Sequence, residues 1–170
     1  MKKSIVIVAL ALGFGFCFTG CEDEVKFNNP SFEAQRDYKL WRATNSVAEV
    51  KEGTLRVYGT DGVESLVMTI PNYSYGGTYD FGTNETNIAT YRIIEEDVTY
   101  TYKTGYNLGG GTLYIDPIEK QIPGFISGTF LVTTALVQGV EIKEVTLNKG
   151  TFFRIPLREV TAQAPSEIVE

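Results

Sequence analysis

The chain of 170 residues contains no histidine and only two cysteines, Cys17 and Cys21. Histidine is the commonest general base near neutral pH and the commonest metal ligand in proteins. Its absence, together with the lack of any cysteine after Cys21, excludes zinc sites built from these residues and catalytic pairs in which histidine activates serine or cysteine. Carboxylate chemistry, lysine chemistry and calcium bound through oxygen atoms remain. We expect no cofactor and no metal site.

The uncharged apolar run near the N-terminus is too short to span a membrane. It covers residues 5–18, and 14 residues fall short of the roughly 20 that a transmembrane helix needs. Lys2 and Lys3 precede the run, and the small residues Thr19 and Gly20 follow it. This order is typical of a secretory signal that is cleaved and discarded. We predict such a signal over residues 1–20.

The segment Phe18-Thr19-Gly20-Cys21 resembles the bacterial lipobox, although Phe18 stands where leucine is usual. In a lipobox the cysteine receives a diacylglyceryl group and becomes the first residue of the mature protein. The alternative is an ordinary cleaved signal followed by a free thiol. Two or three acyl chains on one residue anchor a protein firmly, because each buried methylene contributes about 0.8 kcal/mol. We therefore expect Cys21 to be lipidated and to tether the protein to a membrane.

The acidic residues Glu22, Asp23 and Glu24 directly follow this cysteine. Acidic residues at this place resemble the surface-export signal of Bacteroidota-type lipoproteins, whereas the alternative is a solvated spacer. We expect an outer-membrane lipid anchor with the domain on the cell surface; the periplasmic face of the same membrane is the alternative. Residues 21–30 then form a lipidated, flexible tether.

Negative charge dominates the chain after residue 20. These 150 residues hold 21 acidic and 13 basic side chains, a net charge of −8. Their number is typical of a single domain. A negative domain without a basic cluster is a poor ligand for phosphate backbones, so we expect no nucleic-acid partner. With no cysteine left to form a disulfide, packing and backbone pairing must supply the stability.

Nearly every segment after residue 30 alternates apolar and polar residues, and turn residues separate the segments. Residues 98–102 alternate most clearly, and Phe125–Ala135 forms a longer, more apolar strand that we place centrally. No segment has the 3.6-residue period of a helix. The pattern predicts an all-β fold, a single antiparallel β-sandwich of about 8–10 strands over residues 31–158; a closed sheet is the alternative. Residues 159–170 carry little apolar pattern, and we expect a loose tail there.

Turn residues also predict where the first and last hairpins bend. Arg36-Asp37 is the expected bend after the first strand. At the end of the domain, strands over Val145–Leu147 and Thr151–Leu157 are expected to pair through a turn at Asn148-Lys149-Gly150. Such clusters of asparagine and glycine between apolar runs are typical of tight turns.

Several strand and turn motifs occur in a recognisable order along the chain. They are Phe32-x-Ala34 followed by Trp41, then Gly77-Thr78-Tyr79, then residues 126–130 (ISGTF), and finally residues 145–152 (VTLNKGTF). With the lipobox, they resemble an uncharacterised family of small Bacteroidota lipoproteins built as a β-sandwich. The resemblance covers residues 31–157, but Arg36-Asp37 replaces the Asn-Gly turn expected after the first strand. It implies the fold and the location, and it brings no activity and no catalytic residue.

The best candidate site in the sequence is the loop from Pro71 to Gly77. Tyr73 and Tyr75 could form a stacking platform for a sugar ring, and Asn72 could supply hydrogen bonds. The alternative is a hairpin connection whose tyrosines cover the edge of the sandwich.

Two further clusters have simpler structural interpretations. Tyr100 and Tyr102 share a strand face, and such a stripe is usually cross-strand packing. Residues 95–97 (Glu-Glu-Asp) form the densest acidic cluster, yet they lack the alternating ligands and the glycine of a calcium loop. We therefore expect packing at the first cluster and a solvated turn at the second.

Taken together, these features favour a membrane-anchored, non-enzymatic lipoprotein whose domain binds a glycan or a protein at the cell envelope. The first alternative is a structural subunit of an envelope assembly that has no small ligand. The weaker alternative is a carboxylate-dependent hydrolase. A glycosidase would need two carboxyl groups about 5 to 10 Å apart in a cleft, and no pair stands out in the sequence.

Overall fold

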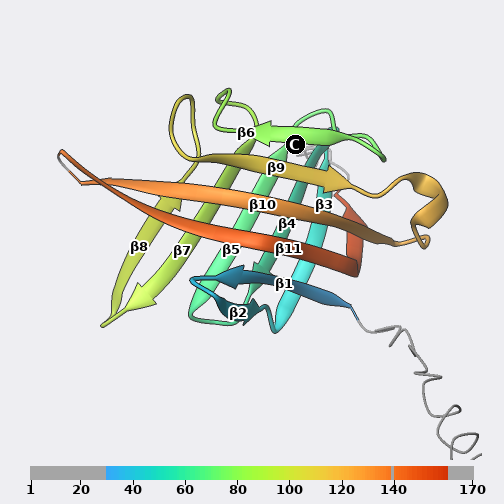
Figure 1. The fold of residues 1–170 in the computed structure, drawn as a ribbon. Coiled ribbons are helices and arrows are strands. Elements are labelled where there is room, and N and C mark those ends of the chain that lie inside the picture. The colour runs from blue at the N-terminus through green and yellow to red at the C-terminus, as the bar shows by residue number, and fades with distance from the viewer. Residues whose placement is uncertain (1–29, 139, 161–170) are drawn as a thin grey trace, which may run out of the picture.

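A computed structural model describes residues 30–138 and 140–160 of the chain. The predicted signal, Cys21, nearly all of the tether and residues 161–170 lie outside this part. The described residues form 11 strands and one short 3-10 helix, η1 (Figure 1). The elements are β1 (Ser31–Arg36), β2 (Lys39–Arg42), β3 (Asn45–Lys51), β4 (Thr54–Thr60), β5 (Glu64–Ile70), β6 (Thr78–Phe81), β7 (Ile88–Glu95), β8 (Val98–Lys103), β9 (Gly110–Ile115), η1 (Ile118–Lys120), β10 (Phe125–Gln138) and β11 (Glu141–Glu159).

Backbone hydrogen bonds join all 11 strands into one sheet, in the order β2-β1-β11-β3-β4-β5-β7-β8-β10-β9-β6. The sheet folds over so that β6, β9, β10, β11, β1 and β2 lie in front of β3, β4, β5, β7 and β8 and cross them (Figure 1). At one side Ala135 of β10 pairs with Lys103 of β8. At the other side the end of β11 pairs with β3 in parallel, with Leu157 opposite Ala48. The predicted all-β class is confirmed, and the strands form one continuous sheet.

Alternation along the strands places the core between the two layers. In β4 the side chains of Leu55 and Val57 are fully buried, and in β5 those of Leu66, Met68 and Ile70 are fully buried. Because successive side chains in a strand point to opposite faces, each of these strands supplies one apolar face to the interior. The sequence pattern therefore identifies these core positions correctly.

Two Gly-Thr-Phe segments lock β10 and β11 together at the centre of the front layer. Gly128 is paired with Phe152, and Phe130 is paired with Gly150. A Cβ atom on Gly150 would lie 2.4 Å from the ring of Phe130, and one on Gly128 would lie 2.5 Å from the ring of Phe152. Each phenylalanine thus packs where the opposite glycine has no side chain. The two rings reach the core, where the centroid of the Phe32 ring lies 5.4 Å from that of the Phe130 ring and 6.2 Å from that of the Phe152 ring.

The predicted turn at Asn148-Lys149-Gly150 is wrong, because β11 continues through it as one strand of 19 residues. Phe130 pairs with Gly150 and Val132 pairs with Leu147, so two residues of β11 oppose one residue of β10. This arrangement is a β-bulge, which uses the same left-handed backbone conformation as many turns. Lys149 adopts it, with φ 49°. A local turn signal therefore marks a kink within a strand here.

The bend of the first hairpin lies one residue later than predicted. Arg36 pairs with Lys39, so the two turn residues are Asp37 and Tyr38. Both have positive φ, 49° and 63°, as a two-residue hairpin turn of type I′ requires. Asn-Gly is the usual sequence for such a turn; here Tyr38 occupies the second position with its side chain 99% exposed.

A polar network ties the end of the front strand β1 to two strands of the back layer. Arg36 Nη1 lies 2.5 Å from Glu64 Oε1 of β5 and donates a hydrogen bond of 2.6 Å to Tyr91 Oη of β7. Tyr91, which is fully buried, in turn donates to Glu64 Oε2 at 2.7 Å. Burial opposes the charge of Arg36, but the contacts with Tyr91 and Glu64 outweigh it and raise the arginine pKa. The network fixes the two layers relative to each other.

Candidate functional site

The loop between β5 and β6 carries the three candidate ligand residues that the sequence indicates. Asn72 is exposed and has φ 54°, whereas Tyr73 and Tyr75 are half-buried and pack against the core. The two rings meet edge to face, with centroids 5.9 Å apart and planes at 77°. Rings at this angle do not present one flat surface to a ligand. The tyrosines instead cover apolar interior at this end of the domain.

Polar contacts within the loop hold this arrangement together. The backbone N–H of Ser74 donates to Tyr79 Oη, and the Tyr79 hydroxyl lies 3.2 Å from the Ser74 carbonyl, to which it donates. Burial raises the pKa of Tyr73 to about 12, and Tyr75 and Glu159 add to the effect. Glu159 ends β11, so Tyr73 is set near the place where β11 meets the back layer. These contacts favour the covering role that the sequence left as the alternative.

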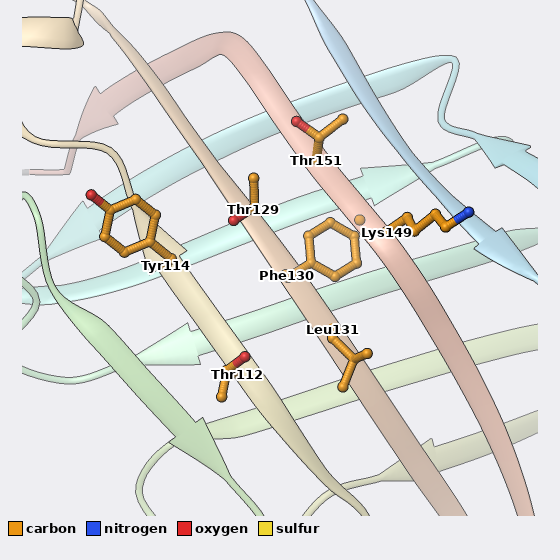
Figure 2. A pocket seen from close by; sticks show the side chains of 8 residues that line it. Thr112, Tyr114, Thr129, Phe130, Leu131, Lys149 and Thr151 are labelled. Carbon is orange, nitrogen blue, oxygen red and sulfur yellow. The ribbon is translucent and has the colours of Figure 1, made fainter.

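A shallow groove of about 370 Å³ lies on the outer face of β9, β10 and β11 (Figure 2). Tyr114 and Lys149 lie on opposite sides of the labelled side chains, and threonines project between them (Figure 2). The groove is lined by Thr112, Tyr114, Thr129, Phe130, Leu131, Lys149, Gly150 and Thr151.

Strand pairing explains how these side chains come together. Tyr114 is opposite Thr129, and Thr129 is opposite Thr151, so the three form a row across the sheet. Neighbouring strands are about 4.8 Å apart, which makes the row roughly 10 Å long. Leu131 is the next outward-facing residue of β10 after Thr129, and it is 46% exposed. Tyr114 is 37% exposed. Lys149 is two residues before Thr151 and shares its face of the strand, opposite Leu131, and the bulge that follows toward Asn148 turns Leu147 inward.

The chemistry of the groove is that of a binding surface. Threonine and tyrosine hydroxyls can donate and accept hydrogen bonds, and a lysine ammonium supplies three donors. The ring of Tyr114 and the side chain of Leu131 add apolar area. No carboxylate lines the groove, and among residues 30–138 and 140–160 no group of three or more acidic residues is arranged to hold a metal ion.

Both clusters for which we expected simple structural roles lie in the hairpin formed by β7 and β8. Tyr100 and Tyr102 pack against the core, and the Tyr102 ring is 6.0 Å from that of Tyr91. Glu96 and Asp97 form the hairpin turn, with φ 50° and 62°.

The sequence signals only part of the groove. In each Gly-Thr-Phe segment the phenylalanine points inward, so alternation requires the threonine before it, Thr129 or Thr151, to point outward. That signal could have identified the outer face of β10 and β11. The same alternation places Lys149 on the face of Thr151, which lies two residues later, whereas nothing in the sequence pattern places Tyr114 beside these threonines, because its position depends on strand pairing.

Comparison with known proteins adds one finding. The model of one protein family, described as a domain of unknown function (DUF6252), matches residues 28–156. No curated protein and no solved structure matches the chain. Within the part of the chain that the structure describes, no helix is long and apolar enough to cross a membrane. The match agrees with the expected resemblance to an uncharacterised family; the bacterial group and the lipidation stay predictions.

Proposed function

We propose a binding function for this chain, which belongs to the DUF6252 family of domains of unknown function. In this proposal the protein is a non-enzymatic outer-membrane lipoprotein, lipidated at Cys21, whose β-sheet domain binds a glycan at the cell envelope. The site is the groove across β9, β10 and β11 rather than the loop that holds Asn72, Tyr73 and Tyr75.

The observation that carries the proposal is the combination of side chains in the groove. An exposed tyrosine ring, Tyr114, lies beside outward-facing threonines and one lysine. Sugar rings offer apolar C–H faces to an aromatic ring and many hydroxyls to hydrogen-bonding groups, and both kinds of group are present here. The row of roughly 10 Å matches an oligosaccharide of two or three units better than a single sugar.

A tether at Cys21 suits this use of the domain. Nine residues, 22–30, separate the predicted lipid site from Ser31, the first residue of β1. Fully extended, ten residue steps span at most about 36 Å. The domain would therefore stay close to the membrane yet be free to turn its outer face toward a glycan.

Glycan-array binding of the full chain tests this function. Tyr114→Ala should abolish binding and Lys149→Ala should weaken it, whereas Tyr106→Ala should leave it unchanged because that exposed side chain lies outside the groove. Loss of binding in Tyr73→Ala and Tyr75→Ala, with Tyr114→Ala unaffected, would move the site to the loop. Absence of binding by the unaltered chain to any glycan would refute the function.

Two alternatives give different results in that experiment. A structural subunit of an envelope assembly would bind no glycan and would be recovered with envelope proteins in a pull-down from the native membrane. A carboxylate-dependent hydrolase would release product from a glycan over time. The groove gives the hydrolase no acid–base pair, because no carboxylate lines it.

A further inference from the structure

The hairpin between β10 and β11 projects beyond the rest of the sheet (Figure 1). The last pair between β10 and a strand other than β11 is Ala135 with Lys103, and the β1 pairing of β11 stops at Leu147. Within the described part of the chain, residues 136–138 and 141–143 therefore pair only with each other, and residues 144–146 of β11 pair only with β10. We call these residues the arm. Among the described residues, its β11 side has no strand partner beyond β10, and this free strand edge leaves backbone groups available to another strand.

One face of the arm is apolar and exposed. Val137 and Ile142 are paired across the two strands, with 53% and 61% of their side chains exposed, and Val140 near the tip is fully exposed. A two-stranded ribbon alone has little stability in water. Addition of further strands at the free edge would satisfy its backbone groups and cover this face.

The charges along the free edge indicate which strand fits there. Glu141, Lys143 and Glu144 are all exposed, and Ile142 lies between the first two. If a second copy adds its own edge antiparallel, the symmetry axis is perpendicular to the sheet, so each residue must oppose one that points to the same face. One residue of each edge must then lie opposite its own copy in the second chain, and the axis passes between these two residues. An axis through Lys143 or Glu144 would set like charges opposite each other.

An axis through Ile142 gives a complementary register. It places Glu141 opposite Lys143 of the second copy twice, and Ile142 opposite its own copy. Val137 and Ile142 of both copies then form one apolar row across four strands. Opposite charges in directly opposed positions favour pairing, and like charges oppose it.

We propose that this protein self-associates through its arm, as a two-fold dimer in which the β11 edges pair antiparallel about Ile142. The partner is a second copy of the chain, and the contact leaves the groove on β9, β10 and β11 free. The dimer does not depend on the proposed glycan binding.

Sedimentation of the full chain in detergent tests the dimer. Glu141→Lys alone sets lysine opposite lysine and should weaken self-association by at least about tenfold, because two attractive pairs become two repulsive pairs. Lys143→Glu alone should have the same effect. An equimolar mixture of these two single variants should restore the dimer as a heterodimer, because each charge then faces its opposite. The double variant should also dimerise.

A matched control carries the same charge change elsewhere. Glu119→Lys alters an exposed residue of η1, away from the arm, and should leave the dimer intact. Thermal unfolding of each variant checks that the domain is folded. A monomeric unaltered chain overturns the proposal. Failure of the mixture to associate, or dimerisation of Glu141→Lys as strong as that of the unaltered chain, also overturns it.

Discussion

Adding a single methyl group at Gly150 should destabilise the domain through the ring of Phe130. The Cβ of an alanine at Gly150 would lie 2.4 to 2.5 Å from three ring atoms of Phe130, whereas carbon atoms in contact prefer about 3.5 to 4.0 Å. The ring must therefore withdraw by about 1 Å in a packed core, where overpacking costs about 1 to 3 kcal/mol. A Gly→Ala change also lowers the conformational entropy of the unfolded chain, which stabilises the folded state and offsets about 0.4 to 1 kcal/mol of this loss. We expect a net loss of roughly 1.5 kcal/mol, or about 5 °C in Tm.

The same reasoning predicts that a smaller side chain at Phe130 relieves the clash. Phe130→Leu alone should cost about 1 to 2 kcal/mol through the cavity that it leaves. In the double variant with Gly150→Ala, the new methyl group fills part of that cavity. The two losses should therefore sum to at least about 1 kcal/mol more than the measured loss of the double variant. Urea unfolding of the four proteins measures this coupling free energy.

Gly128 and Phe152 supply the control pair. A Cβ on Gly128 would lie 2.5 Å from the Phe152 ring but also 2.3 Å from the backbone carbonyl oxygen of Tyr114. Shortening Phe152 to leucine leaves the backbone clash in place, so this cycle should show far weaker coupling. Additive losses at Gly150 and Phe130, within about 0.5 kcal/mol, would refute the reasoning, as would equal coupling in both pairs.

Two further predictions concern pH and the network between the layers. Because the Tyr73 pKa is raised from about 10 in an unfolded chain to about 12, the stability that its neutral hydroxyl contributes is complete below pH 10 and is lost as pH rises through 12. Tyr73→Phe should flatten that part of a plot of Tm against pH, and an unchanged slope would contradict the assignment. Arg36→Met should cost about 2 kcal/mol in urea unfolding, because it leaves Glu64 half-enclosed beside Tyr91 without its cation. Arg42→Met, which breaks a more exposed ion pair, should cost less than about 1 kcal/mol, and equal losses would count against the network.

Strand positions were readable from the sequence, and strand partners were only partly so. Alternation at Leu55 and Val57 reports which side of a strand is apolar, because that period is a local property of the chain. At Asn148-Lys149-Gly150 the local signal is ambiguous, since a turn and a β-bulge use the same backbone conformation. Pairing with β1 and β10 on both sides makes the segment a bulge. A single strand viewed without its neighbours could not reveal this.

The candidate site divides in the same way. The sequence identified Tyr73 and Tyr75 because a loop rich in glycine and tyrosine is visible locally, but their burial against the core depends on the strands beneath. The groove is assembled from three strands, and pairing of β10 with β9 and β11 brings Tyr114 to the side of Thr129 opposite Thr151. Its residues are far apart in the chain, and the sequence contains no signal that joins Tyr114 to Lys149.

The sequence by itself determined the all-β class, the apolar face of each strand, the lack of histidine chemistry and the negative charge. These follow from composition and from a two-residue period, which need no knowledge of distant residues. Only the tertiary structure decided that one sheet closes through β11 and β3, that Gly128 and Gly150 receive phenylalanine rings, and that the arm has a free edge. Each depends on which strands lie side by side, and long-range packing settles that choice.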